Sequence, residues 1–273
     1  MYTEKDHTFA ICAYKTCEYL EECIKSLMTQ TVKSTVLMST STPNDHIRTL
    51  AEKYNIPLFV NEGEKGIAQD WNFALKCAET DLITLAHQDD VYKPAYTEYM
   101  LKCINRAKTP IFFFSRYGEI RNGKEVFSST LLDVKNILCA PLAISGKSKF
   151  AKWFCLAFGD GILCPSVTYV RSIILNHLFE SDMKCSLDWE EYSMLAKLPG
   201  SIVYSSRPLL LHRIHSEAET TKFVENNARV PEDYQMFLKY WPAPVAKILT
   251  RLYSRGERTY QNEFKNKRNN TGS

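Results

Sequence analysis

Between residues 8 and 86, short apolar runs alternate with amphipathic segments, and this alternation constrains the fold more than any other feature of the chain. Four apolar runs have the length of buried strands: residues 8–14, 35–38, 57–60 and 82–86. Three segments between them carry apolar side chains at helical spacing: residues 19–30, 45–54 and 68–78. Repeated strand–helix units of this kind predict a doubly wound α/β fold with a mostly parallel central sheet.

The loops that follow the first, second and fourth strands are expected on one rim of this sheet, because the crossovers between parallel strands are right-handed. Ligands of open α/β sheets bind outside the carboxyl ends of the strands. Two adjacent carboxylates, Asp89 and Asp90, follow the fourth strand there. They are suited to a hard divalent cation that takes its other ligands from substrate phosphates. The alternative is a solvated acidic turn that caps the next helix.

The composition excludes several classes of protein. Hydrophobic residues make up 45% and charged residues 24%, as in ordinary globular chains, and the net charge of +3 is too small to indicate nucleic-acid binding. No apolar run reaches the roughly 18–20 residues of a membrane span, and the N-terminus lacks the pattern of a signal peptide. The nine cysteines are odd in number and form no Cys-x-x-Cys pair, which argues against a disulfide framework and a zinc site. These features predict a cytoplasmic protein.

The pattern is less regular after about residue 110. Residues 111–114 and 125–127 are predicted to form a hairpin, and residues 202–204 another strand. Residues 155–170 mix aromatic residues, glycines and a proline, which is typical of the wall of a pocket, and residues 187–198 have helical spacing.

Residues 234–258 interleave aromatic and aliphatic side chains with lysines and arginines. A basic amphipathic helix of this kind can lie on an anionic membrane surface. It can equally pack on the rest of the chain with its basic face in solvent. The segment is followed by a basic, asparagine-rich tail at residues 265–270.

The order of the motifs resembles that of glycosyltransferase family 2, whose members have the GT-A fold. The resemblance covers roughly residues 8–221, and it is the order of several individually weak motifs that makes it specific. The Gln88-Asp89-Asp90 run is similar to that of bacterial rhamnosyltransferases in this family. The matching segments are Ile11 to Lys15, Tyr19-Leu20, Ser26-Leu27, Gln30-Thr31, Gly66 to Asn72, His87-Gln88-Asp89 at the Asp-x-Asp metal motif, Leu187 to Glu190, and Arg213-Ile214-His215.

The resemblance implies a division of the chain into a catalytic domain and an extension. Residues 1–221 would form a GT-A catalytic domain, with a Rossmann-like, mostly parallel sheet flanked by helices. Within it, residues 1–110 would bind a nucleotide-sugar and residues 111–221 the acceptor. Residues 222–273 would form a helical, basic C-terminal extension.

The resemblance also implies the reaction. It is the inverting, metal-dependent transfer of a hexosyl or deoxyhexosyl group from a nucleoside-diphosphate sugar to a hydroxyl of a glycan or lipid-linked saccharide, as in bacterial surface-polysaccharide synthesis. An acceptor on a lipid would suit peripheral association with the inner face of the cell membrane through residues 234–258.

Each proposed role falls on particular residues. Asp188, at the start of an apolar-acidic helix, is the expected catalytic base, with Glu191 in reserve. Mn²⁺ or Mg²⁺ would be bound by Asp89, Asp90 and His215. The acceptor would contact Asp160 and Trp189. The donor would contact Ala13, Tyr14, Lys15, Ser39, Ser41, Asn72, His87 and Asp89.

Most of these positions also have a structural interpretation. Asp188 can be an acid that the helix dipole favours at an N-terminus. His215 can be a structural histidine, with His212 as a competing metal ligand. Asp160 can simply form a turn between two glycines.

Three departures from the family pattern leave the nucleotide open. His87 replaces the first aspartate of Asp-x-Asp, Ser39 to Ser41 replaces an aspartate that faces the nucleobase, and Trp71 replaces an arginine. These losses keep a second hypothesis open, a non-catalytic module that only binds a nucleotide-sugar. A sugar nucleotidyltransferase is disfavoured, because the loop from Ala13 to Cys17 contains no glycine.

Overall fold

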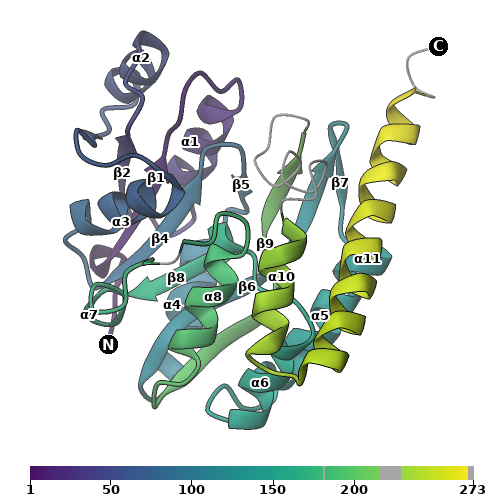
Figure 1. Ribbon diagram of the computed structural model, residues 1–273. Helices are drawn as coiled ribbons and strands as arrows, with labels where there is room; N and C mark the ends of the chain where they lie inside the picture. The colour runs from purple at the N-terminus through teal and green to yellow at the C-terminus, as the bar shows by residue number, and fades with distance from the viewer. Residues whose placement is uncertain (181, 216–228, 270–273) are drawn as a thin grey trace.

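The computed structural model describes residues 1–180, 182–215 and 229–269, and Figure 1 shows helices packed around a central sheet. Within these residues the sheet has nine strands, in the order β3-β2-β1-β4-β8-β6-β9-β5 with β7 paired to β6. The strands are β1 (His7–Cys12), β2 (Thr35–Thr40), β3 (Leu58–Val60), β4 (Leu82–His87), β5 (Val91–Tyr92), β6 (Pro110–Arg121), β7 (Lys124–Val126), β8 (Val167–Val170) and β9 (Ser201–Ile214). The α-helices are α1 (Leu20–Met28), α2 (Asp45–Lys53), α3 (Ile67–Cys77), α4 (Tyr96–Arg106), α5 (Thr130–Ile144), α6 (Lys149–Ala157), α7 (Arg171–Ile174), α8 (Leu187–Leu195), α10 (Arg229–Leu238) and α11 (Ala243–Asn269).

The N-terminal half has the predicted strand–helix repeats. Strands β1, β2, β3 and β4 are parallel, and the α1 residues expected to be apolar and inward-facing are buried against them. Helix α2 begins after Asn44, whose side chain accepts a hydrogen bond from the Ile47 amide at 3.1 Å, as an N-cap residue does. The register pairs Cys12 with Ser39 on one side and with His87 on the other. Three predicted loops therefore start at the same edge of the sheet.

The C-terminal half contains longer elements than the sequence pattern indicates. A hairpin is present as β6 and β7, joined at Asn122 and Gly123, which both have positive φ. The predicted pairing was wrong, because β7 pairs with residues 119–121 of β6, whereas residues 112–114 pair with β8 and β9. The predicted strand at 202–204 was too short, because β9 continues to Ile214 along the whole of β6. Exposed Ser206 and Arg207 interrupt its apolar pattern, and the register shifts at this point.

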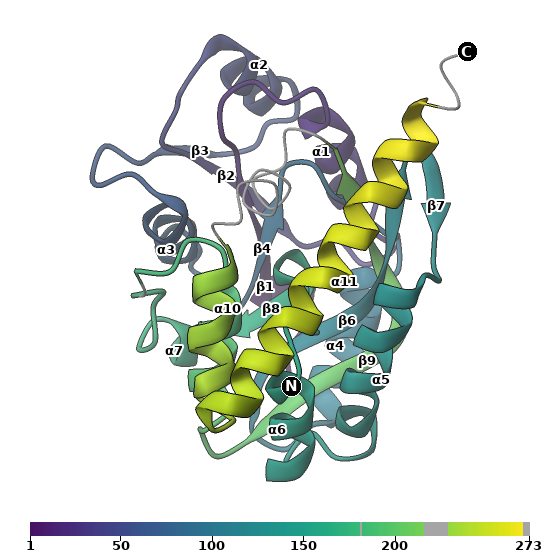
Figure 2. The same cartoon turned by 45° about the vertical axis from the view of Figure 1, so that its right-hand side comes forward.

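The C-terminal amphipathic stretch forms two helices rather than one. Helix α10 ends at Leu238 and α11 begins at Ala243, after Trp241-Pro242. Both helices pack on the body of the protein (Figure 2). Phe237 of α10 and Tyr253 of α11 are in ring contact with Trp189. The predicted domain boundary at 221–222 lies outside the described residues. No helix in the described part of the chain has the length and apolar character needed to cross a membrane.

Candidate active site

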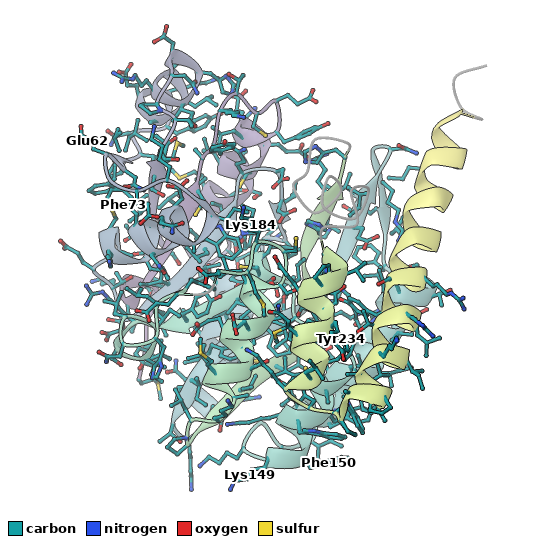
Figure 3. The ribbon with its side chains drawn as sticks, in the orientation of Figure 1. Glu62, Phe73, Lys149, Phe150, Lys184 and Tyr234 are labelled. Carbon is teal, nitrogen blue, oxygen red and sulfur yellow. The ribbon has the colours of Figure 1, made fainter. Side chains whose placement is uncertain are left out.

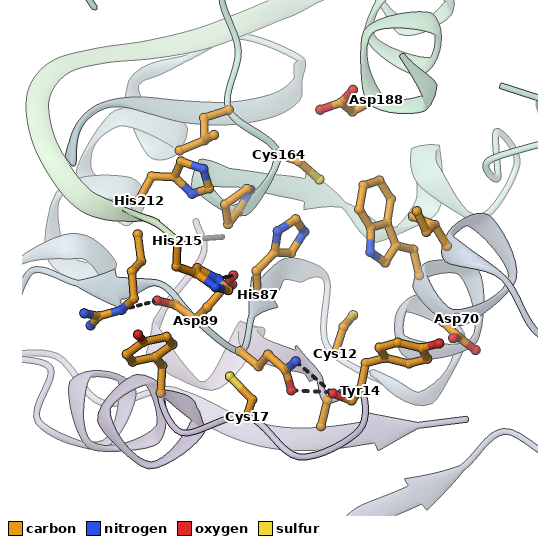
Figure 4. A pocket seen from close by; sticks show the side chains of 18 of the residues that line it. Cys12, Tyr14, Cys17, Asp70, His87, Asp89, Cys164, Asp188, His212 and His215 are labelled. Atoms are coloured by element: carbon orange, nitrogen blue, oxygen red, sulfur yellow. Dashed lines mark hydrogen bonds and ion pairs between the residues drawn. The ribbon is translucent and has the colours of Figure 1, made fainter. Parts of the chain in front are cut away.

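A cleft of about 1250 Å³ opens at the carboxyl ends of β1, β2 and β4. Its walls come from both halves of the chain (Figure 4). The fold therefore brings most of the predicted site residues to one place, although they are far apart in sequence. Those that line the cleft are Ala13, Tyr14, Lys15, Ser39, Ser41, His87, Asp89, Asp160, Asp188 and His215.

The loops after β1 and β4 are tied together by the side chain of Gln88. Its carbonyl oxygen accepts from the Tyr14 amide at 2.9 Å, and its amide nitrogen donates to the Tyr14 carbonyl at 3.0 Å. The paired hydrogen bonds imitate one step of a β-ladder. They hold Tyr14, whose ring is exposed, at the rim of the cleft, on the side of Asp70 in Figure 4.

A carboxylate that sequence reasoning missed lies at the same end of the cleft. Asp70, in the first turn of α3, accepts a hydrogen bond from the Ser41 hydroxyl at 2.6 Å and another from the Asn61 amide at 2.8 Å. Its segment was interpreted from apolar spacing and from the resemblance of Gly66 to Asn72 to a family motif, and neither gave Asp70 a role. A signal was present: the first turn of a helix that follows a strand faces the carboxyl edge of a parallel sheet.

Asp89, in the loop after β4, pairs with His215, which directly follows β9. The Asp89 carboxylate lies 2.8 Å from Nε2 of His215. Burial alone would raise the pKa of Asp89, but the hydrogen bond from His215 and the positive charge of His212 lower it below its ordinary value. Arg213 fixes this arrangement, because its Nε donates to the Asp89 carbonyl at 3.0 Å and its guanidinium contacts Glu22 at 2.6 Å. Asp89 is therefore ionised and firmly held.

His87 occupies the centre of the cleft in Figure 4. Its ring stacks on Trp71, with centroids 5.3 Å apart. Burial lowers the pKa of His87, so the imidazole is neutral at neutral pH. Its Nε2 has no hydrogen-bond partner among the described residues. A buried nitrogen of this kind is available to a ligand, because it costs free energy while it stays unsatisfied.

Two carboxyl groups, Asp188 and Asp160, form the opposite wall of the cleft. Burial raises the pKa of Asp188, partly offset by the positive charge of Arg229. Burial and the negative charge of Asp188 raise the pKa of Asp160 to about 8. Asp188 therefore ionises first and Asp160 keeps its proton near neutral pH. The Asp188 Oδ1 accepts a 2.9 Å hydrogen bond from the Trp189 amide, which fixes its direction.

Three predicted contact residues, Asp90, Asn72 and Trp189, are not among the residues that line the cleft. Asp90 is fully buried, and its Oδ1 accepts from His212 Nδ1 and from the Arg213 amide, both at 2.9 Å. Asp90 therefore anchors β9. Burial of the His212 imidazole lowers its pKa, but the Asp90 charge outweighs this effect and raises the pKa to about 9. Asn72 points away from the cleft, where its side chain bonds both the amide and the carbonyl of Phe179. Trp189 is completely buried and donates to the Leu156 carbonyl at 3.0 Å, so it belongs to the core.

The reserve base, Glu191, also lies away from the cleft. Its side chain is 1% exposed, and neither carboxyl oxygen has a hydrogen-bond partner among the residues that the structure describes. Burial, together with the charges of Glu190 and Glu180, raises its pKa to about 8. The structure offers it no route to an acceptor in the cleft.

Replacing Glu191 by glutamine is expected to stabilise the protein above neutral pH. The folded protein binds the Glu191 proton more tightly than the unfolded chain, so this carboxyl lowers the free energy of unfolding as pH rises from about 4.5 to about 8. An uncharged amide removes that loss, roughly 1–3 kcal/mol for a buried group without a partner. Thermal melting at pH 5 and pH 8.5 measures it. A variant that gains nothing at the higher pH would contradict the assignment.

The donors near Asp89 fit a cation that is shared with a substrate. Asp89 and His215 supply one carboxylate and one imidazole, and the adjacent His87 Nε2 has no described partner. The described residues contain no group of three histidine, cysteine, aspartate or glutamate side chains able to hold a metal alone. Mg²⁺ and related ions commonly bind through one or two carboxylates plus substrate phosphates. The cleft matches that pattern.

Comparison with solved structures identifies the fold. The S. aureus TarS fragment 1–349 aligns with a TM-score of 0.57 and 16% identity, covering 90% of this chain and 69% of that chain. The mannosyltransferase PcManGT from Pyrobaculum calidifontis, in complex with GDP-Man and Mn²⁺, aligns with a TM-score of 0.62 and 14% identity over 93% and 70%. Glucosyl-3-phosphoglycerate synthase from Mycobacterium tuberculosis aligns at 0.51 and 14% over 77% and 73%. The predicted GT-A α/β fold is thereby confirmed.

Comparison by sequence reaches the same family. A search of curated proteins gives no match. The family model for glycosyl transferase family 2 matches residues 8–179, which contain β1 to β8 and the loop with Asp89. The chain therefore belongs to glycosyltransferase family 2.

Proposed function

We propose that the protein is an inverting glycosyltransferase that moves a sugar from a nucleoside diphosphate to a hydroxyl of a glycan or lipid-linked saccharide. One observation carries the proposal: Asp188 lies across a single cleft from Asp89 and His215 (Figure 4). A base on one wall and a diphosphate site on the other leave the sugar between them. Attack from the side opposite the leaving group inverts the anomeric carbon.

The nucleotide end of the cleft supports binding despite the altered motifs. The exposed Tyr14 ring offers a stacking surface for a base. The family aspartate after β2 is absent, but Asp70 brings a carboxylate from α3 to Ser41 at the end of β2. We infer that the Ser41–Asp70–Asn61 network takes over base recognition. Trp71, which replaces an arginine, holds His87 by stacking instead of meeting a phosphate.

The acceptor wall supplies the proton transfer. Asp188 accepts the proton of the acceptor hydroxyl as its oxygen attacks the anomeric carbon. Asp160, still protonated near neutral pH, can donate a hydrogen bond to a sugar hydroxyl beside it. Because the pKa values of the two carboxyl groups differ, Asp188 accepts a proton while Asp160 donates a hydrogen bond.

A divalent cation, Mn²⁺ or Mg²⁺, would be held by Asp89 and His215, with Asp90 fixing the strand behind them. When bound, it would stabilise the negative charge that develops on the departing diphosphate. Among the structural neighbours, complexes with GDP-Man and Mn²⁺ and with UDP, Mn²⁺ and glucosyl-3-phosphoglycerate are known. A hexosyl or deoxyhexosyl donor and a role in bacterial surface-polysaccharide synthesis are part of the same proposal.

Thermal melting with UDP, GDP and dTDP, each with and without Mn²⁺, tests this function. Ligand at about 100 times its dissociation constant stabilises the fold by roughly 2.7 kcal/mol, so one nucleotide is expected to raise the melting midpoint by about 5–10 °C. Asp70→Asn should reduce this shift. Release of nucleoside diphosphate from the donor then separates an enzyme from a module that only binds. No shift with any nucleotide would contradict the proposal.

A further inference from the structure

Helix α5 presents an apolar stripe to solvent. Val134, Ile137 and Ile144 recur at helical spacing on its outer side, and Ile137 and Ile144 are 64% and 90% exposed. Phe150, at the start of α6, is 65% exposed, and Figure 3 shows it with Lys149 at the lower end of the molecule. Contiguous exposed apolar side chains are unusual on a protein that has no partner for them.

Helix α11 adds a second stripe beside the first. Its inner side packs on the protein through Ala246, Leu249, Thr250 and Tyr253, while Ile248 and Leu252 are 56% and 58% exposed. Helix α11 contacts α5, and the two helices lie along the same side of the molecule in both ribbon views (Figures 1 and 2). We call the exposed apolar residues of these helices, with Phe150, the α5–α11 face: Val134, Ile137, Ile144, Phe150, Ile248 and Leu252.

Basic side chains border the α5–α11 face. They are all exposed, and α5 contributes only one acidic residue, Asp133, to the same region. Two of them precede or begin α6 and three lie on α11: Lys147, Lys149, Lys247, Arg251 and Arg255.

We propose that the α5–α11 face docks the protein onto an anionic membrane surface. Exposed apolar side chains ringed by lysine and arginine combine burial among acyl chains with attraction to anionic head groups. A second copy of the chain fits the face less well. A symmetric contact would bring like patches together and oppose the basic residues of one copy to those of the other.

The same helix connects this face with the cleft. Leu131 and Lys135, one turn apart on α5, line the cleft, and Val134 between them belongs to the exposed stripe. The cleft therefore opens next to the docked surface on the wall formed by α5. If the protein has the proposed function, on which this step rests, the placement indicates an acceptor that is carried on a lipid and reaches Asp188 from the membrane.

Sedimentation of the full chain with vesicles tests the docking surface. The protein is expected to sediment with vesicles that contain about one-third phosphatidylglycerol, and to remain in solution with pure phosphatidylcholine or at high salt, where charges are screened. Lys247→Gln with Arg251→Gln should lower partitioning about thirtyfold, because each removed charge accounts for a factor of about five. Ile137→Asp with Ile144→Asp should reduce it to a similar extent.

The matched control is Met28→Asp. Met28 is an exposed methionine on α1, in the other half of the chain, and this variant should bind vesicles like the unchanged protein. Each variant should keep the nucleotide-dependent melting shift, so that reduced partitioning reports on the face alone. Absence of the shift in the unchanged protein would count against the proposed function and not against the face. Wild-type protein that stays in solution with anionic vesicles would overturn the docking proposal. A dimer in solution that the α5 variants separate would overturn it as well.

Discussion

Replacing Asp188 by asparagine is expected to lower the rate of sugar transfer by about a thousandfold, the middle of the range for a general base. The amide keeps the size of the carboxyl group and can still accept the hydrogen bond from the Trp189 amide. It cannot take the acceptor proton. Folding should be unaffected or slightly improved, since a buried carboxyl with a raised pKa is removed. Initial rates with a nucleotide-sugar donor, together with thermal melting, measure both effects.

The matched control for Asp188→Asn is Asp160→Asn. The Asp160 pKa of about 8 means that its carboxyl is neutral at pH 7, and a neutral amide resembles it closely. This variant should therefore retain most of the rate at pH 7. In the unchanged enzyme, kcat/KM should rise with pH as Asp188 ionises, above the ordinary aspartate value of 3.8. Asp188→Asn with more than about a tenth of the original rate would remove Asp188 as the base, because base catalysis contributes at least about a hundredfold.

Replacing Asp89 by alanine is expected to abolish transfer while leaving circular dichroism and cooperative melting intact. The side chain supplies the carboxylate that pairs with His215, at 2.8 Å, and its negative charge is what favours a cation there. The fold should survive, because Arg213 bonds the Asp89 backbone carbonyl and not its carboxylate. The loss should also appear in binding, as a nucleotide melting shift that no longer responds to Mn²⁺.

An exposed aspartate outside the cleft, Asp45 at the start of α2, is the control for this change. Asp45→Ala should leave turnover and the metal-dependent shift unchanged. Turnover retained by Asp89→Ala would refute the metal role of Asp89. Unfolding of the variant would instead show that the carboxylate is structural, and Asp89→Asn, which keeps the shape of the side chain, would then separate charge from packing.

The sequence by itself determined the N-terminal sheet and the edge at which the cleft forms. Apolar runs and helical spacing depend on neighbours within one element, so they indicate which face of each strand or helix is buried. Parallel strands joined by right-handed crossovers then place the loops with Tyr14, Ser41 and Asp89 at one edge. These relations need no knowledge of distant contacts.

Only the tertiary structure decided what each polar side chain contacts. Asp89 and Asp90 are adjacent in sequence, yet one faces the cleft with His215 and the other is buried against His212. Asp70 proved to be a cleft residue, hydrogen-bonded to Ser41 from another element, whereas Trp189 next to Asp188 proved to be core. Each outcome depends on partners from distant parts of the chain, and local periodicity carries no information about which distant strand or helix will supply them.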